Sequence, residues 1–191
     1  MQLLISFSCL VFLYLPVSSE VSEGTTHNIT LGSLEPKMEE IGGSFNTSMI
    51  PLSMKVNSNS VLHKFSVRLG KITSARVHVQ VWRHEGSNKY KLIRTRELRD
   101  MYEGVNVMEV RWYLTAGDYV GLSCSGNCPV YKDPSQPAFA SKIKMSDRLS
   151  KQGFYEGMVL LFNDPLLKSR LALQAEGIST LYHTIQRIPL L

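Results

Sequence analysis

The clearest periodic pattern in the chain runs from Ala75 to Trp82, where apolar and polar residues alternate strictly. Three valines occupy one side of this alternation, and the other side carries Arg76, His78, Gln80 and Trp82. A period of two residues is typical of a half-buried β-strand, because successive side chains point to opposite faces of a sheet. We expect the valines to face the core and the other four residues to face solvent or a partner.

Further segments have the character of strands and are separated by turn signals. Residues 85–88 (Glu-Gly-Ser-Asn) predict a turn, so residues 75–82 and 89–95 predict a β-hairpin. A short helix within Leu92–Met101 is the alternative for that part of the chain. The other strand-like segments are residues 61–69, 106–112, 119–124, 157–162 and 170–175. Short strands at roughly regular spacing predict an all-β fold, an antiparallel β-sandwich.

The pattern changes near residue 49 and again near residue 135. Residues 20–48 are polar, rich in Ser, Thr, Gly and Glu, and predict a flexible N-terminal arm. We expect residues 49–191 to form the sandwich domain. Within it, residues 135–152 have little periodicity and predict a long loop, where binding surfaces are often found.

The first residues have the features of a secretory signal peptide. An apolar run of 13 residues from Leu3 to Leu15 is followed by Pro16 and by the small residues Val17-Ser18-Ser19. A membrane-spanning helix needs about 20 apolar residues, so this run is too short for one. We expect residues 1–19 to be removed and the mature protein to be secreted to the extracellular space.

Cysteine content agrees with an oxidising compartment. Cys9 lies in the predicted signal peptide, so the mature chain keeps Cys124 and Cys128. An even pair predicts one disulfide that closes a tight loop. The alternative is a redox-active pair, which needs a helix start to stabilise a thiolate, whereas Gly126, Asn127 and Pro129 predict a turn.

Two sequons also agree with secretion. Asn28-Ile29-Thr30 and Asn46-Thr47-Ser48 both fit the acceptor pattern for N-linked sugar. Both lie in the polar N-terminal stretch, so Asn28 and Asn46 are expected to be exposed and to carry sugar.

Three motifs resemble those of jelly-roll modules in the extracellular adhesive or lectin-like proteins of invertebrates. They are residues 79–83 (VQVWR), residues 90–93 (YKLI) and residues 116–122 (AGDYVGL). The resemblance covers residues 60–180 and implies a jelly-roll sandwich with a binding role. It supplies no catalytic residue.

Positive charge is concentrated between residues 64 and 100, where ten Lys or Arg stand against three Asp or Glu. A sheet face that carries this charge can bind a sulfated glycan, an anionic lipid or an acidic protein. An equal alternative is that the charges form a solvated surface that only keeps the protein soluble. Nucleic acid is disfavoured by the extracellular compartment. The residues expected to form this anionic-ligand face are Arg76, His78, Trp82, Lys89, Lys91, Arg94 and Arg96.

Motifs for catalysis or metal binding are absent from the sequence. The sequence contains no nucleophile-elbow motif (G-x-S-x-G). The five histidines do not have the spacing of a zinc site: His27, His63, His78, His84 and His183. Four loop aspartates could hold calcium but are explained more simply as turn formers: Asp118, Asp133, Asp147 and Asp164. We therefore expect no metal and no cofactor.

The sequence favours a secreted, non-enzymatic interaction module that binds extracellular glycan or protein through loops or the basic sheet face. One alternative is a secreted enzyme whose site is dispersed along the chain. Another is a matrix or coat component that works by self-association.

Overall fold

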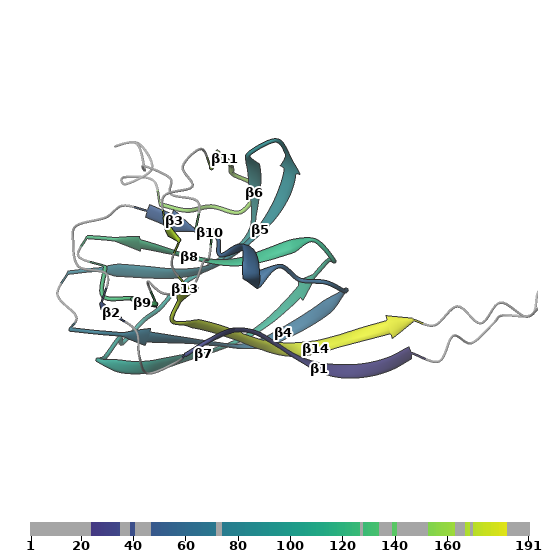
Figure 1. Ribbon diagram of the computed structural model, residues 1–191, viewed down its shortest axis with the longest axis horizontal. Coiled ribbons are helices and arrows are strands. Elements are labelled where there is room, and N and C mark those ends of the chain that lie inside the picture. Colours follow the sequence, from purple (N-terminus) through teal and green to yellow (C-terminus); the bar gives the residue numbers. More distant parts are fainter. Residues whose placement is uncertain are drawn as a thin grey trace, which may run out of the picture.

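The computed structural model shows an all-β protein made of antiparallel sheets (Figure 1). It describes residues 24–34, 39–40, 47–71, 74–126, 128–133, 139–140, 153–162, 167–168 and 170–182. Two sheets, of four and five strands, face each other across a shared core. The predicted antiparallel β-sandwich is confirmed.

The strands of the four-stranded sheet, in spatial order, are β1 (Gly24–Ser33), β14 (Leu173–Tyr182), β4 (Ser60–Leu69) and β7 (Gly104–Leu114). Those of the five-stranded sheet are β11 (Val159–Leu161), β6 (Lys89–Glu97), β5 (Arg76–Gly86), β8 (Asp118–Ser125) and β3 (Thr47–Met49). Smaller elements complete the fold: η1 (Leu52–Met54), β2 (Glu39–Glu40), β9 (Tyr131–Asp133), β10 (Phe139–Ala140), β12 (Leu167–Lys168) and β13 (Arg170–Leu171).

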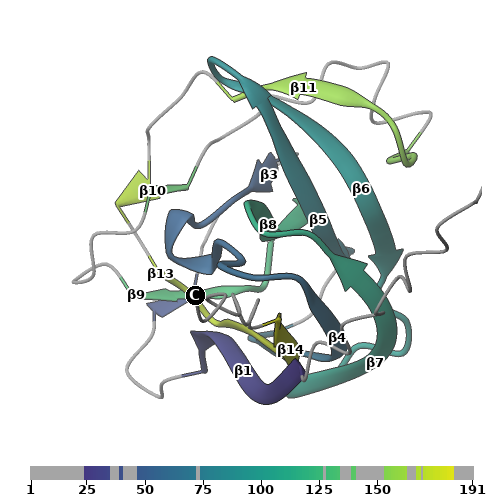
Figure 2. The same ribbon diagram turned by 90° about the vertical axis from the view of Figure 1, so that its right-hand side faces the viewer.

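The main strands pair as a nested hairpin that is rolled into two sheets. β5 pairs with β6, β4 with β7, β3 with β8, and β1 with β14, so strands far apart in sequence are neighbours in space. The four-stranded sheet also pairs β14 with β4, and the five-stranded sheet pairs β5 with β8. This wrapping of eight strands is the jelly-roll topology. Figure 2 shows the four-stranded sheet curving beneath the five-stranded one.

The core between the sheets is built from the inward residues of each alternating strand. Val77, Val79 and Val81 of β5 are fully buried there, as the alternation predicted. They pack in one cluster with residues of β4 such as Phe65 and Val67. Burial of these side chains is the main driving force for the sandwich.

The five-stranded sheet also buries part of its outer face. A second cluster forms there from Ile50, Trp82, Leu92, Met158 and Phe162, and the last two lie directly before and after β11. The rings of Trp82 and Phe162 meet edge to face, with centroids 5.1 Å apart. β5 is therefore covered on both faces over much of its length.

One glycine makes the second cluster possible. Gly121 in β8 lies opposite Gln80, two pairs along the ladder from Trp82 and on the same face of the sheet. A Cβ atom added there would lie 2.7 Å from the carbonyl oxygen of Met49 and 3.2 Å from the Trp82 ring. The missing side chain thus lets the indole lie against the sheet.

The prediction of a flexible arm over residues 20–48 is wrong for residues 24–33. Residues 24–33 form β1, which pairs along its full length with β14. Ile29 and Leu31 alternate with polar residues and pack against the core, a short strand pattern that composition alone concealed. The predicted signal peptide and most of residues 135–152 lie outside the described residues.

The hairpin and the other main strands are where the sequence predicts them. β6 is a strand throughout, so the alternative helix within Leu92–Met101 is wrong. Within the described ranges, no helix has the length and apolar character needed to cross a membrane.

Candidate functional site

An ion pair between a buried carboxylate and a half-exposed arginine organises the end of the sandwich where β5 meets the turn between β7 and β8. Asp118, at the start of β8, is 1% exposed in its side chain, and Arg83 lies directly opposite it in β5. Arg83 Nε donates to Asp118 Oδ1 at 2.7 Å, and Nη2 donates to Oδ2 at 3.0 Å. This hydrogen bonding to Asp118 raises the pKa of Arg83, so the guanidinium stays charged.

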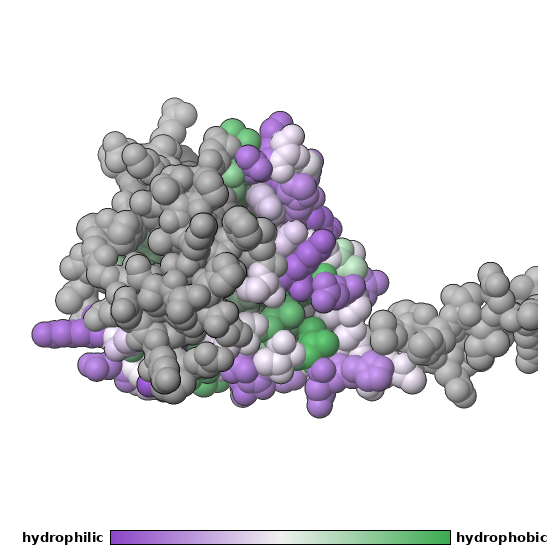
Figure 3. Space-filling model, in the orientation of Figure 1, coloured by the Kyte–Doolittle hydropathy of each residue, from purple (hydrophilic) through white to green (hydrophobic). Residues whose placement is uncertain are grey.

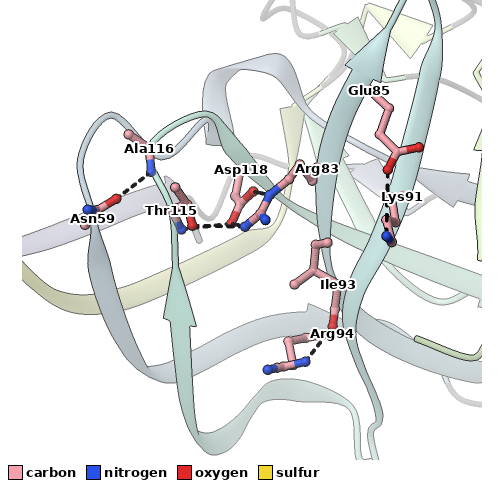
Figure 4. A network of polar contacts seen from close by, with 9 residues as sticks. All are labelled: Asn59, Arg83, Glu85, Lys91, Ile93, Arg94, Thr115, Ala116 and Asp118. Carbon is pink, nitrogen blue, oxygen red and sulfur yellow. Dashed lines mark hydrogen bonds and ion pairs between the residues drawn. The ribbon is translucent and has the colours of Figure 1, made fainter. Parts of the chain in front are cut away.

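The same carboxylate holds the turn in place. Asp118 Oδ2 accepts a hydrogen bond from the backbone N–H of Thr115 at 2.9 Å, and the Asp118 N–H donates to the Thr115 carbonyl. Gly117 adopts φ +95°, which suits a residue without a side chain. The Ala116 N–H donates to Asn59 Oδ1 at 3.1 Å, which ties the turn to the segment before β4 (Figure 4). Asp118 is a turn former, as predicted.

This network forms one wall of an open pocket of about 390 Å3, which we name the hairpin pocket. Its lining residues are Lys55, Arg83, His84, Thr115, Ala116, Gly117, Asp118 and Tyr119. The volume lies within the range typical of small-ligand sites. Hydrophilic side chains cover the surface of the β5–β6 hairpin next to it (Figure 3).

Cations and aromatic rings share the hairpin pocket. Lys55 Nζ lies 5.8 Å from the centroid of the Tyr119 ring, and among the described residues no carboxylate lies within 4 Å of it. His84 Nε2 donates to the Ser87 carbonyl at 2.6 Å, and its ring packs against Tyr90. Tyr90 in turn packs edge to face on Tyr119. The pocket therefore presents positive charge beside an apolar aromatic surface.

The structure breaks up the basic face that the sequence predicts. Trp82 is fully buried in the second cluster, so the prediction that it faces solvent is wrong. Periodicity shows that one face of β5 is apolar, but it does not show that residues 153–162 cover the other face. Gln80 is buried on the same side, and its Oε1 accepts a hydrogen bond from Trp82 Nε1.

The predicted cations also lie on different faces. Arg94 and Arg96 of β6 are opposite Val81 and Val79, the valines that face the core. They are thus on the reverse face from Arg76 and His78. Arg96 Nη1 reaches the Glu109 carbonyl of β7, an edge strand of the other sheet. A β-bulge at residues 92–94 sets this register, which no sequence pattern revealed.

Carboxylates neutralise three of the predicted cations. The ion pairs are Arg76–Glu97 at 4.0 Å, Lys91–Glu85 at 3.9 Å and Arg94–Glu156 at 2.9 Å. Lys89 and Lys91 remain near the hairpin pocket, because Lys91 lies opposite Arg83 at the end of the hairpin. At the other end of β6, Arg96 lines a separate open cavity of about 660 Å3, where Glu97, Asp100 and Glu109 also contribute carboxylates.

The predicted disulfide and one predicted sequon are placed by the structure. Cys124 and Cys128 are joined, with Cα atoms 5.5 Å apart. Asn28 is exposed in β1. Asn46 lies outside the described residues.

A row of polar residues crosses the outer face of the five-stranded sheet. Ser48, Ser123, His78 and Glu97 are successive cross-strand partners on β3, β8, β5 and β6. Burial lowers the pKa of His78, while the charge of Glu97 raises it to a smaller extent. Both serine hydroxyls are buried, and neither has a hydrogen-bond partner among the described residues. No three His, Cys, Asp or Glu side chains within those residues gather into a possible metal site.

Sequence reasoning missed Lys55, His84 and Tyr119 as members of one site. Tyr119 belongs to the Ala-Gly-Asp-Tyr motif and His84 follows the Trp-Arg pair, so each lay next to a motif already noted. Lys55 lies between η1 and β4, and only the strand register brings it beside Tyr119. The sequence carried no signal for that juxtaposition.

Comparison with protein-family models, with curated proteins and with solved structures finds no match to this chain. The resemblance to invertebrate jelly-roll modules stays a prediction.

Proposed function

We propose that this protein is a secreted interaction module that binds anionic glycans through the hairpin pocket. The observation that carries the proposal is the position of Lys55 and His84 beside the Tyr119 ring, in an open cavity. A sugar ring can pack its C–H surface on the tyrosine while a sulfate or carboxylate group meets the Lys55 ammonium group. Charge-assisted hydrogen bonds of this kind are the strong ones.

Arg83 supports the site without being its main ligand. Its Nε and Nη2 atoms are engaged by Asp118 and Thr115, which fixes the guanidinium and the pocket wall. Lys55 is exposed and can reorient toward a ligand, whereas His84 is exposed but held by the Ser87 carbonyl and the Tyr90 ring. The pocket therefore combines a rigid wall with one adaptable cation.

We expect the combined variant Lys55→Ala and His84→Ala to lose affinity for a sulfated oligosaccharide by about tenfold or more. A hydrogen bond to a charged group contributes about 1.5–3 kcal/mol, and 1.4 kcal/mol corresponds to a factor of ten. Calorimetric titration measures the affinity at two salt concentrations, and binding should weaken as salt rises because of screening. A desulfated oligosaccharide should bind less tightly.

The matched control is Lys71→Ala combined with His63→Ala. It removes the same residue types from exposed positions that do not line the pocket. Equal affinity of the two double variants would refute the pocket as the glycan site and leave the basic residues as a solvated surface.

A secreted hydrolase is a second candidate, supported by the cross-strand row Ser123–His78–Glu97. Directly opposed residues have Cβ atoms about 4.5–5.5 Å apart, so a change of side-chain rotamer would bring the serine and the histidine within hydrogen-bonding distance. As it stands, Ser123 Oγ has no hydrogen-bond partner among the described residues. Because Ser123 is buried, the face above it would have to open first. A fluorophosphonate probe should then label the wild type and not Ser123→Ala. Lack of labelling, alongside a reactive control hydrolase, would count against this candidate.

A further inference from the structure

The sequon at Asn28 lies at the end of an exposed apolar row on the outer face of the four-stranded sheet. Cross-strand pairing aligns Asn28 of β1 with Ile178 of β14, Val61 of β4 and Tyr113 of β7. Ile178 is 43% exposed and Tyr113 is 63% exposed, while Val61 is half-buried. Figure 1 shows these four strands side by side along the lower edge of the molecule.

The strand geometry of β1 presents this sequon correctly for modification. Ile29 packs against the core, so Asn28 and Thr30, on either side of it, both point outward and are exposed. The asparagine and the hydroxyl residue that an acceptor site requires thus share one accessible face.

The row beside the apolar one is polar. Thr30, Glu176, Lys64 and Glu109 are cross-strand partners there, and Lys64 pairs with Glu176 at 2.8 Å. The exposed apolar side chains that share a row with Asn28 therefore form a strip bordered by charge. Ile178 is one strand spacing from Asn28, and Tyr113 is three, or about 14 Å at roughly 4.8 Å per strand.

We propose that Asn28 carries an N-linked glycan whose inner sugars cover the strip formed by Ile178, Val61 and Tyr113. The glycan keeps an exposed sheet face from associating with other molecules. In the modification, the Asn28 side-chain nitrogen bonds to the anomeric carbon of a lipid-linked diphospho-oligosaccharide. The amide loses a proton as the lipid diphosphate leaves.

The proposal goes beyond glycan binding in the hairpin pocket and depends only on secretion. Its first test is occupancy. The full chain is expressed in eukaryotic cells, once with its own N-terminal residues and once with residues 1–19 replaced by a proven leader. Peptide mass spectrometry after enzymatic sugar release should find Asn28 converted to aspartate. Thr30→Ala should abolish the modification and Thr30→Ser should retain it.

The second test is coverage. Secreted Asn28→Gln protein should bind an apolar fluorescent dye more strongly than wild type. In sedimentation velocity, its association midpoint should shift severalfold to lower protein concentration. Adding Tyr113→Thr should reverse both changes. Adding Val107→Thr should not, because Val107 is 57% exposed on the same strand but belongs to another row.

Each outcome has a consequence for the proposal. Unmodified Asn28 in protein that reached the medium would overturn it. Glycosylated Asn28 with no change of dye binding or association in Asn28→Gln would overturn the covering role. Modification seen with the proven leader alone would support the glycan site and refute the predicted signal peptide, while leaving the pocket proposal to its own binding test.

Discussion

Replacing Trp82 with alanine should lower the free energy of unfolding by about 3–5 kcal/mol, the usual cost of truncating a buried aromatic side chain. Trp82 is completely buried and forms the centre of the second cluster, against Phe162 and Leu92. Its removal leaves a cavity and takes away the hydrogen-bond donor that Gln80 Oε1 uses. Chemical denaturation of the full chain measures the change.

The control for this variant is Tyr155→Ala. Tyr155 belongs to the same covering segment, residues 153–162, but is 57% exposed. We expect it to change stability by no more than about 0.5 kcal/mol, as for an ordinary surface position. If the two variants cost the same, the second cluster is not a core and Trp82 is free to face a partner, as the sequence suggested.

The contrast between Val79 and Trp82 shows what periodicity can predict. Alternation identifies strands because it follows from backbone geometry, and it correctly identified β4 to β8 and the inward valines. Whether the other face of β5 is exposed or buried depends on which distant residues pack over it. Met158 and Phe162 lie more than 70 residues away, so the burial of Trp82 is a tertiary effect.

The candidate site depends on register in the same way. Arg94 and Arg96 were included in the predicted face with Arg76 although the sequence left the strand register open, and the bulge at Ile93 places them opposite the core valines. A shift of one residue moves a side chain to the other face of a sheet, and turn signals do not fix where a bulge occurs. Charge density was visible in the sequence, whereas the clustering of Lys55 with Tyr119 needed the fold.

The sequence predicts the fold class, a β-sandwich, but not which strands pair in the jelly roll. Strand number and turn spacing favour a sandwich, whereas the pairing of β1 with β14 joins segments at opposite ends of the described chain. Residues 24–33 looked like an arm because their apolar residues are few. Pairing with β14 supplies the hydrogen bonds, and Ile29 and Leu31 supply the contacts that hold the strand.

Asp118→Asn should destabilise the protein by about 1–3 kcal/mol, because it removes the charge from a buried carboxylate and leaves some of its hydrogen-bond donors without an acceptor. The carboxylate accepts two hydrogen bonds from Arg83 and one from the Thr115 backbone. An asparagine can accept on one atom only, and its N–H2 group would face the guanidinium donors. Half of the Arg83 side chain is exposed, so solvent recovers part of the loss.

A double-mutant cycle with Arg83→Met isolates the contribution of the pair. Each single variant leaves one charged or polar partner unmatched, whereas the double variant removes the charge from both residues. We therefore expect the double variant to lose clearly less free energy of unfolding than the two single variants together. A strictly additive result would mean that the interaction between Arg83 and Asp118 contributes nothing to stability. The cycle also separates scaffold from ligand groups in the hairpin pocket. Asp118→Asn should lower stability and loosen the pocket wall, whereas the Lys55→Ala and His84→Ala variant should keep wild-type stability and lose glycan affinity.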